Sequence, residues 1–170
     1  LMTIMVHIVP HATLLIDSPT RAAGVVSTIG FSSMLGRFLM GLVIDRIGTK
    51  KSTILCYGLL ILTLLWLQVA KAPWMLYLFA VFDGIAHGGV FTIISPIVAE
   101  FFGIKSHGSL FGIVVFASTT GGAAGPLITG RIFDIAGSYY PAFWVLTGIS
   151  LLGLVLISML KPVPIVSNPR

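Results

Sequence analysis

Long apolar runs separated by short polar connections are the dominant pattern of this chain. Most of the runs approach the ~20 residues that a helix needs to cross the hydrocarbon of a bilayer. They are too long and too continuous for the strands of a membrane barrel, so we expect helices. The pattern predicts an all-α integral membrane domain over residues 1–161 and a short tail over residues 162–170. The expected spans are residues 1–11, 22–44, 52–70, 74–99, 108–132 and 141–160.

The first expected span is shorter than the others. His and Pro interrupt the run "LMTIMVHIVPHA" after about half a membrane thickness, and the sequence starts at Leu1. We expect Leu1 to lie inside a helix whose beginning precedes this sequence. An N-terminal half of the same protein is therefore an expected partner.

The charge pattern supports a membrane setting and gives an orientation. Charged residues are 9% of the chain, against roughly a quarter in soluble domains. The net charge of +5 is spread over the connections and forms no patch, so it indicates membrane topology and not nucleic-acid binding. The positive-inside rule then predicts a cytoplasmic C-terminus, in the plasma (inner) membrane. The richer set of connections holds Arg46, Lys50, Lys51, Lys105, Lys161 and Arg170, and the poorer set holds Arg21, Lys71 and Arg131.

Arg37 is the most informative polar residue, because it lies about two-thirds of the way along an apolar run. A charge within a span costs roughly 2.5–3.5 kcal/mol on insertion scales, so it normally faces protein or water and has a role. About eight residues, or ~12 Å of helix rise, separate Arg37 from Asp45 at the end of the span. The planar guanidinium matches a carboxylate, so Arg37 is predicted to bind an anionic substrate. The alternative is an arginine that only reaches the cytoplasmic interface.

The connection after residue 44 places an acid, a glycine and several bases in a fixed order. In "GLVIDRIGTKK" we expect Asp45 to meet the N-terminus of a neighbouring helix, and Gly48 to allow a tight reversal. The bases are expected to face anionic lipid, which makes membrane lipid a partner. The order predicts a gate between transport states, although the positive-inside rule alone would also place bases here. The predicted gate residues are Gly41, Asp45, Arg46, Gly48, Lys50 and Lys51.

This stretch resembles the motif of the major facilitator superfamily between the second and third helices of each six-helix half. The segments "SPIVAEFFG", "HGSLFG" and "GGAAGPLITGRIFDIAGSY" further resemble the monocarboxylate transporter and oxalate/formate antiporter branch. The resemblance runs through nearly the whole chain. It implies the C-terminal half of a twelve-helix fold, helices 7–12 with the seventh truncated. It also implies a secondary active transporter of small organic anions, not an enzyme, that works by alternating access with proton coupling or exchange.

Carried onto this sequence, the resemblance implies that Arg37 binds the substrate carboxylate, with Ser33 and Ser118 as neighbouring candidates. Animal monocarboxylate carriers have an aspartate at the place of Ser33, and oxalate/formate antiporters have a lysine near the place of Ser118. A site with one fixed positive charge suits a monoanion better than a dianion. The proton-coupling residue, if the carrier has one, is then expected elsewhere.

Two further pairs of polar residues are candidates. Asp83 and His87 lie at i and i+4 on one helical face, and they are candidates for holding a transferable proton. The alternative is a packed polar pair beside glycines. His7 and His11 flank Pro10, and His11 is counted among the substrate-binding candidates.

The spacing of glycines and the lack of a metal-binding motif give two further expectations. Glycines four residues apart are expected to let helices approach closely in the span over residues 108–132. No metal or cofactor is expected, because Asp83 and His87 alone are too few ligands for zinc. The alternatives to an anion carrier are a carrier for a sugar, a drug or another metabolite, and a non-transporting six-helix scaffold. The spaced glycines are Gly108, Gly112, Gly121 and Gly125.

Overall fold

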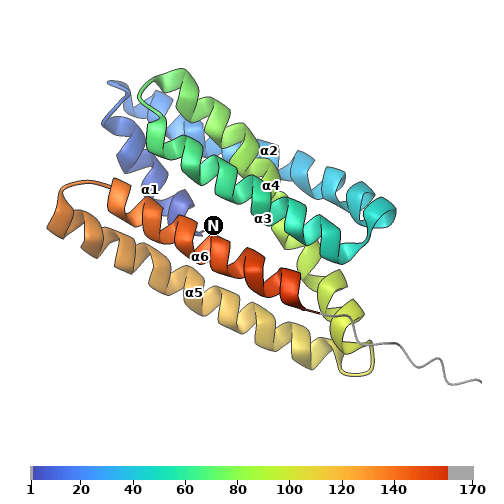
Figure 1. The fold of residues 1–170 in the computed structure, drawn as a ribbon. Coiled ribbons are helices and arrows are strands. Elements are labelled where there is room, and N and C mark those ends of the chain that lie inside the picture. The colour runs from blue at the N-terminus through green and yellow to red at the C-terminus, as the bar shows by residue number, and fades with distance from the viewer. Residues whose placement is uncertain (1, 161–170) are drawn as a thin grey trace, which may run out of the picture.

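The computed structural model describes residues 2–160, and these form an all-α bundle (Figure 1). Five of the six helices, α2 to α6, are long and apolar enough to cross a membrane, which confirms the expected fold class. The predicted tail over residues 162–170, with Lys161 before it, lies outside the described residues. The helices are α1 (Met2–Thr13), α2 (Pro19–Ile47), α3 (Thr49–Val69), α4 (Pro73–Phe102), α5 (His107–Ala136) and α6 (Tyr140–Met159).

Successive helices run in opposite directions, so their connections gather at two ends of the bundle (Figure 1). The α2–α3 and α4–α5 connections lie at the end where α6 finishes, which we name the basic end. The other three connections lie at the opposite end. The basic end carries Arg46, Lys50, Lys51 and Lys105.

Prolines and glycines set several helix ends. Pro19 and Pro73 are the first residues of α2 and α4, where a missing N–H costs nothing and the fixed φ suits a helix. A single residue, Gly48, separates α2 from α3 and has φ of 81°. Glycine adopts this backbone readily because it has no Cβ. The sharp α2–α3 reversal therefore depends on Gly48.

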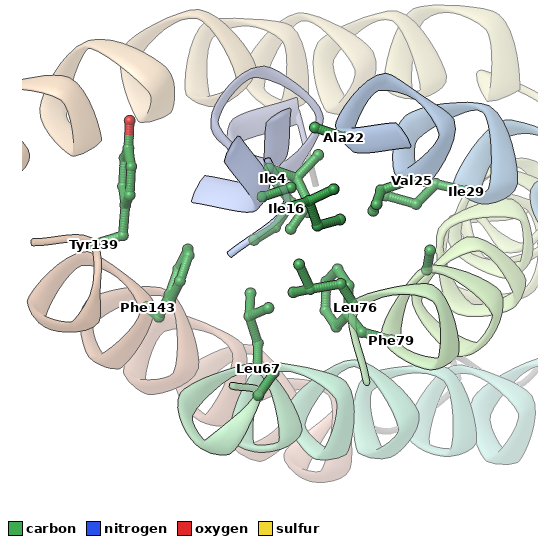
Figure 2. Packing of buried hydrophobic residues seen from close by; sticks show 14 of the residues in the cluster. Ile4, Ile16, Ala22, Val25, Ile29, Leu67, Leu76, Phe79, Tyr139 and Phe143 are labelled. Atoms are coloured by element: carbon green, nitrogen blue, oxygen red, sulfur yellow. The ribbon is translucent and has the colours of Figure 1, made fainter. Parts of the chain in front are cut away.

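The buried apolar side chains form a large cluster towards the opposite end (Figure 2). Ile4, Leu67, Phe79 and Phe143 belong to it and come from four different helices. A smaller cluster of Met40, Cys56 and Ile93 joins α2, α3 and α4. By contrast, Thr129 is the one residue of α5 that is buried. Within the described residues, α5 therefore lies along the outside of the bundle.

Candidate functional site

Arg37 lies where α2 packs against α4. Its guanidinium carbon is 5.9 Å from the centre of the Phe91 ring on α4, within the range of a cation–π contact. The side chain is exposed, and no carboxylate of the described residues lies within ion-pairing distance of it. Arg37 therefore has free hydrogen-bond donors for a ligand.

The position of Arg37 depends on an unusually close approach of the two helices. Gly36 lies against the backbone of Ile85, and Gly84 lies against the carbonyl of Ile29. A Cβ on Gly88 would overlap the carbonyl of Ser33 and would lie 3.0 Å from the backbone nitrogen of Arg37. Small residues at such a crossing let helix backbones come together.

His87 shares the Phe91 ring with Arg37. The centres of the His87 and Phe91 rings are 5.2 Å apart, and the rings are tilted by 46°. The His87 side chain is buried, and its Nδ1 has no hydrogen-bond partner in the described residues. We name Arg37, His87 and Phe91 the Arg37 site. Phe91 was not predicted from the sequence, although its spacing of four residues after His87 places it on the same face of the helix.

Asp83 belongs to a different environment from His87. It is almost wholly buried, and its Oδ1 lies 3.5 Å from Oγ1 of Thr63 on α3. Thr63 Oγ1 also lies 2.8 Å from the carbonyl oxygen of Leu60, and this shorter bond takes the single hydroxyl hydrogen. A neutral Asp83 acid could donate to Thr63, whereas a carboxylate would have no donor there. The other carboxyl oxygen of Asp83 has no partner in the described residues.

A cavity of about 340 Å³ adjoins one of the two acid–base candidates but not the other. Asp83 lines it together with Tyr57 of α3 and Ser150 of α6, whereas Arg37 and His87 do not line it. The sequence predicted that Asp83 and His87 share a helical face within mutual reach. The structure has no hydrogen bond between the two side chains, which instead meet different neighbours.

The other three predicted ligand residues have partners other than Arg37. Ser33 is buried and donates to the carbonyl of Gly30 at 2.7 Å. Ser118 on α5 is exposed and donates to the carbonyl of Val114 at 2.8 Å. The buried His11 ring packs edge-on against Phe143, with the ring centres 5.1 Å apart.

His7 makes polar contacts from α1 to other parts of the chain. Its Nε2 lies 2.9 Å from the carbonyl oxygen of Pro126 on α5 and can donate to it. Its Nδ1 lies 3.4 Å from the hydroxyl of Tyr139 and can then accept from it. His7 therefore connects three parts of the chain, a role that its place in an apolar run did not predict.

The predicted gate residues differ in the contacts that they make. Lys50 Nζ donates to the carbonyl oxygens of Ser158 and Leu160, at 2.8 and 2.6 Å, and so caps the last turn of α6. Asp45 and Arg46 are exposed, and no ion pair involves them in residues 2–160. Gly41 meets no atom to which a Cβ would come close. Lys51 is exposed at the same end.

Metal ligands do not gather in the part of the chain that the structure describes. No three His, Cys, Asp or Glu side chains there could hold one ion. The chemistry of the Arg37 site is instead that of a fixed cation, an imidazole and an aromatic wall. Such a set can bind a small anion and can exchange a proton beside it.

Comparisons with known proteins agree with the fold. The profile of the Major Facilitator Superfamily matches residues 2–170. Monocarboxylate transporter 12 of Homo sapiens is 30% identical over 153 residues, which cover 88% of this chain and 30% of that protein. Monocarboxylate transporter 12 of Xenopus laevis is 31% identical over 151 residues, covering 86% of this chain and 33% of that protein.

A second human relative is equally broad in coverage. Monocarboxylate transporter 7 of Homo sapiens is 28% identical over 160 residues, which cover 92% of this chain and 31% of that protein. The chain thus spans 30–33% of the length of these relatives. The match to the superfamily profile covers almost every residue, and it agrees with the six helices and with the resemblance of the α2–α3 connection. The chain belongs to the Major Facilitator Superfamily and resembles its monocarboxylate transporter branch.

Proposed function

We propose that this chain is part of a secondary active transporter of small organic anions, of monocarboxylate type. The observation that carries the proposal is the Arg37 side chain, which lies on an apolar helix beside Phe91 of α4 and pairs with no carboxylate in the described residues. A cation placed in a membrane span is costly, so it is retained where it binds or conducts something. The similarity to monocarboxylate transporters 12 and 7 supports the same substrate class.

The Arg37 site supplies the recognition chemistry. The guanidinium fork fits a carboxylate in a bidentate manner, and the Phe91 ring lies beside it. With one fixed positive charge, the site favours a monoanion. Ser33, Ser118 and His11 remain candidates for contacts to the rest of the substrate. Because their hydroxyls already bond to their own helices, the two serines would act through their free acceptor positions.

The transport cycle would be alternating access between two related halves. This chain would provide the C-terminal half, and the exposed α5 would face the other half. The basic end would lie in the cytoplasm, as would the C-terminus, in the plasma (inner) membrane. Asp45 and the neighbouring bases would stabilise one gate state. The coupling ion would be a proton, or transport would be exchange, with Asp83 and His87 as the candidates.

The test is uptake by the full-length gene product in proteoliposomes, with lactate, pyruvate, formate and oxalate as labelled substrates. Arg37→Gln should abolish uptake, and Arg37→Lys should retain part of it because the charge stays but the fork is lost. Arg21→Gln, at the opposite end, is the matched control and should transport normally. Elution profiles in detergent check that each variant is folded.

The outcome separates the proposal from its alternatives. If Arg37→Gln is folded and still carries monocarboxylates at the normal rate, the anion-binding role is wrong. Uptake of a sugar or another uncharged compound, with no uptake of the anions, would indicate a carrier of a different substrate class. A folded protein that carries none of these compounds would favour a non-transporting scaffold.

A further inference from the structure

Asp83 and His87 of α4 face different neighbours. Asp83 points to Thr63 of α3 and to the cavity that Tyr57 lines. His87 packs on Phe91, as Arg37 does from α2. A substrate on Arg37 would therefore meet His87, whereas Asp83, about 40° further around α4, faces Thr63 and the cavity.

We propose that His87 is the group that takes up a proton when an anion binds to Arg37, and that Asp83 stays a neutral acid throughout. The proposal rests on the proposed function and assigns the proton to one residue of the same site. It departs from the sequence-based expectation of a shared Asp83–His87 proton.

The guanidinium of Arg37 and the imidazole of His87 both lie beside the Phe91 ring, with the Arg37 guanidinium carbon 5.9 Å and the His87 ring centre 5.2 Å from the ring centre. In an empty site an imidazolium beside the guanidinium would bring together two like charges in a medium of low dielectric constant. A carboxylate on Arg37 brings a negative charge to the same place, and the imidazolium then gains an ion-pairing partner. The unpartnered Nδ1 of His87 supplies a further donor for that carboxylate.

No other charged group competes for this role at the level of His87. Among the helices that pack against α4, α3 contributes Cys56, whose thiol contacts the carbonyl of Ala86. The charged residues of α5, Arg131 and Asp134, lie in its last two turns at the opposite end. On α4 itself, Glu100 is thirteen residues beyond His87, or ~20 Å along the helix. Arg37 is accordingly the charged neighbour that determines the state of His87.

The surroundings of Asp83 favour its neutral form. The hydroxyl hydrogen of Thr63 is already used by the carbonyl oxygen of Leu60, so a neutral Asp83 fits its neighbour better than a carboxylate does. Asp83 is 1% exposed, and a buried unpaired charge is strongly unfavourable. The acid has a structural reason to keep its proton whether or not a substrate is present.

The charge balance of the cycle follows from these two states. The empty site holds one positive charge, on Arg37. The loaded site holds Arg37, the protonated His87 and one monoanion, and its charge is again one positive. A proton from the substrate side bonds to a ring nitrogen of His87 as the anion arrives, and it leaves the same nitrogen when the anion departs. Binding of proton and anion is then reciprocal, as linkage requires.

The experiment measures anion binding to the purified full-length protein in detergent, at a series of pH values between about 5.5 and 8.5. Lactate is the probe, its affinity is read by calorimetry, and proton uptake is read in two buffers of different ionisation enthalpy. The lactate affinity of the wild-type protein should fall by roughly 5- to 150-fold as the pH rises across this range, which is the usual extent of such coupling. Its proton uptake on binding should approach one per anion near neutral pH.

Variants assign the effect to one residue. His87→Gln should bind lactate with an affinity that no longer depends on pH and should take up no proton. Asp83→Asn should keep both the pH dependence and the proton uptake. His107→Gln, at the start of α5, is the control for loss of a histidine and should behave as wild type.

Each result has a clear meaning. Proton uptake that persists in His87→Gln, or that disappears in Asp83→Asn alone, would overturn the proposal while the anion site stands. If wild-type protein binds no lactate, pyruvate or formate at any pH, the proposed function itself has failed. Should His87→Gln not fold, wild-type protein decides, since the absence of proton uptake on anion binding would refute the assignment.

Discussion

The backbone of Gly88 on α4 lies against the carbonyl group of Ser33 on α2, at a separation that leaves no room for a Cβ. The same glycine lies next to the backbone nitrogen of Arg37. His87 precedes Gly88, and Phe91 follows one turn later, so the contact fixes how the imidazole and the aromatic ring stand relative to the guanidinium. The geometry of the Arg37 site is thus a result of helix packing.

Gly88→Ala should destabilise the protein by about 1–3 kcal/mol, because the new methyl group forces α2 and α4 apart. Separation of the helices should also weaken anion binding, since Arg37 and His87 are carried on opposite sides of the contact. Thermal unfolding in detergent and lactate affinity are the two measurements. Gly58→Ala on α3 is the control, because nothing lies within 4 Å of its Cβ position, and it should change little. Equal stability of the two variants would contradict the close packing.

The fold was largely predictable from the sequence, because hydrocarbon allows so few backbone arrangements. The apolar runs and their polar connections identified an all-α membrane fold, and the family resemblance is confirmed by the superfamily profile. Helix ends were less predictable. Helix α2 extends to Ile47, and α5 extends to Ala136, since a helix continues through the interface as long as its backbone bonds are satisfied.

Close helix contacts were predicted only in part. Nothing lies near the Cβ positions of Gly108, Gly112 and Gly121 in the described residues, whereas a Cβ on Gly125 would overlap the Thr3 side chain of α1. A second close approach, which glycine spacing did not predict, lies between α2 and α4 at glycines such as Gly36 and Gly88. Spacing of four residues shows that a helix has a flat face, but not which helix packs against it.

The candidate site was predictable only in part, for a similar reason. A charge within an apolar run singled out Arg37 without knowledge of its neighbours. The partners of Asp83 and His87 could not be read from their i, i+4 spacing, because a difference of about 40° around the helix directs them to different helices. Phe91 was missed because a phenylalanine in a membrane span carries no signal of its own.

Asp83 should tolerate replacement by asparagine better than replacement by alanine. The Asn amide can donate to Thr63 as a neutral acid does, so Asp83→Asn should stay within about 1 kcal/mol of wild-type stability, as expected for one conserved hydrogen bond. Asp83→Ala removes the donor and enlarges a cavity of about 340 Å³, and should cost about 1–3 kcal/mol. Thermal unfolding in detergent measures both. If Asp83→Asn is as unstable as Asp83→Ala, the residue is ionised and the hydrogen-bond assignment is wrong.

Lys50 should contribute to stability through the end of α6. Its amino group donates hydrogen bonds to two carbonyl oxygens at the end of α6. A cation at a helix C-terminus stabilises the helix by about 0.3–1 kcal/mol. Lys50→Met should therefore lower the unfolding temperature and speed hydrogen exchange of the amides near Leu160. Lys51→Met removes the same charge from an exposed neighbour and is the matched control. Identical exchange in the two variants would mean that only the net charge of the basic end matters.

His7 should hold α1 against the rest of the bundle through its two ring nitrogens. His7→Leu places an apolar side chain of similar size there, removes the second hydrogen bond to the Pro126 carbonyl, which keeps its bond within α5, and leaves the Tyr139 hydroxyl without its partner; this should cost about 0.5–1.5 kcal/mol. Tyr139→Phe removes only the longer of the two bonds and should cost less. Hydrogen exchange of α1 and α5, measured together with thermal unfolding, separates loosening of α1 from a general loss of stability. If His7→Leu is as stable as wild type, the contacts to Pro126 and Tyr139 do not hold α1 in place, and the apolar packing of Ile4 and Ile8 in the large cluster is sufficient by itself.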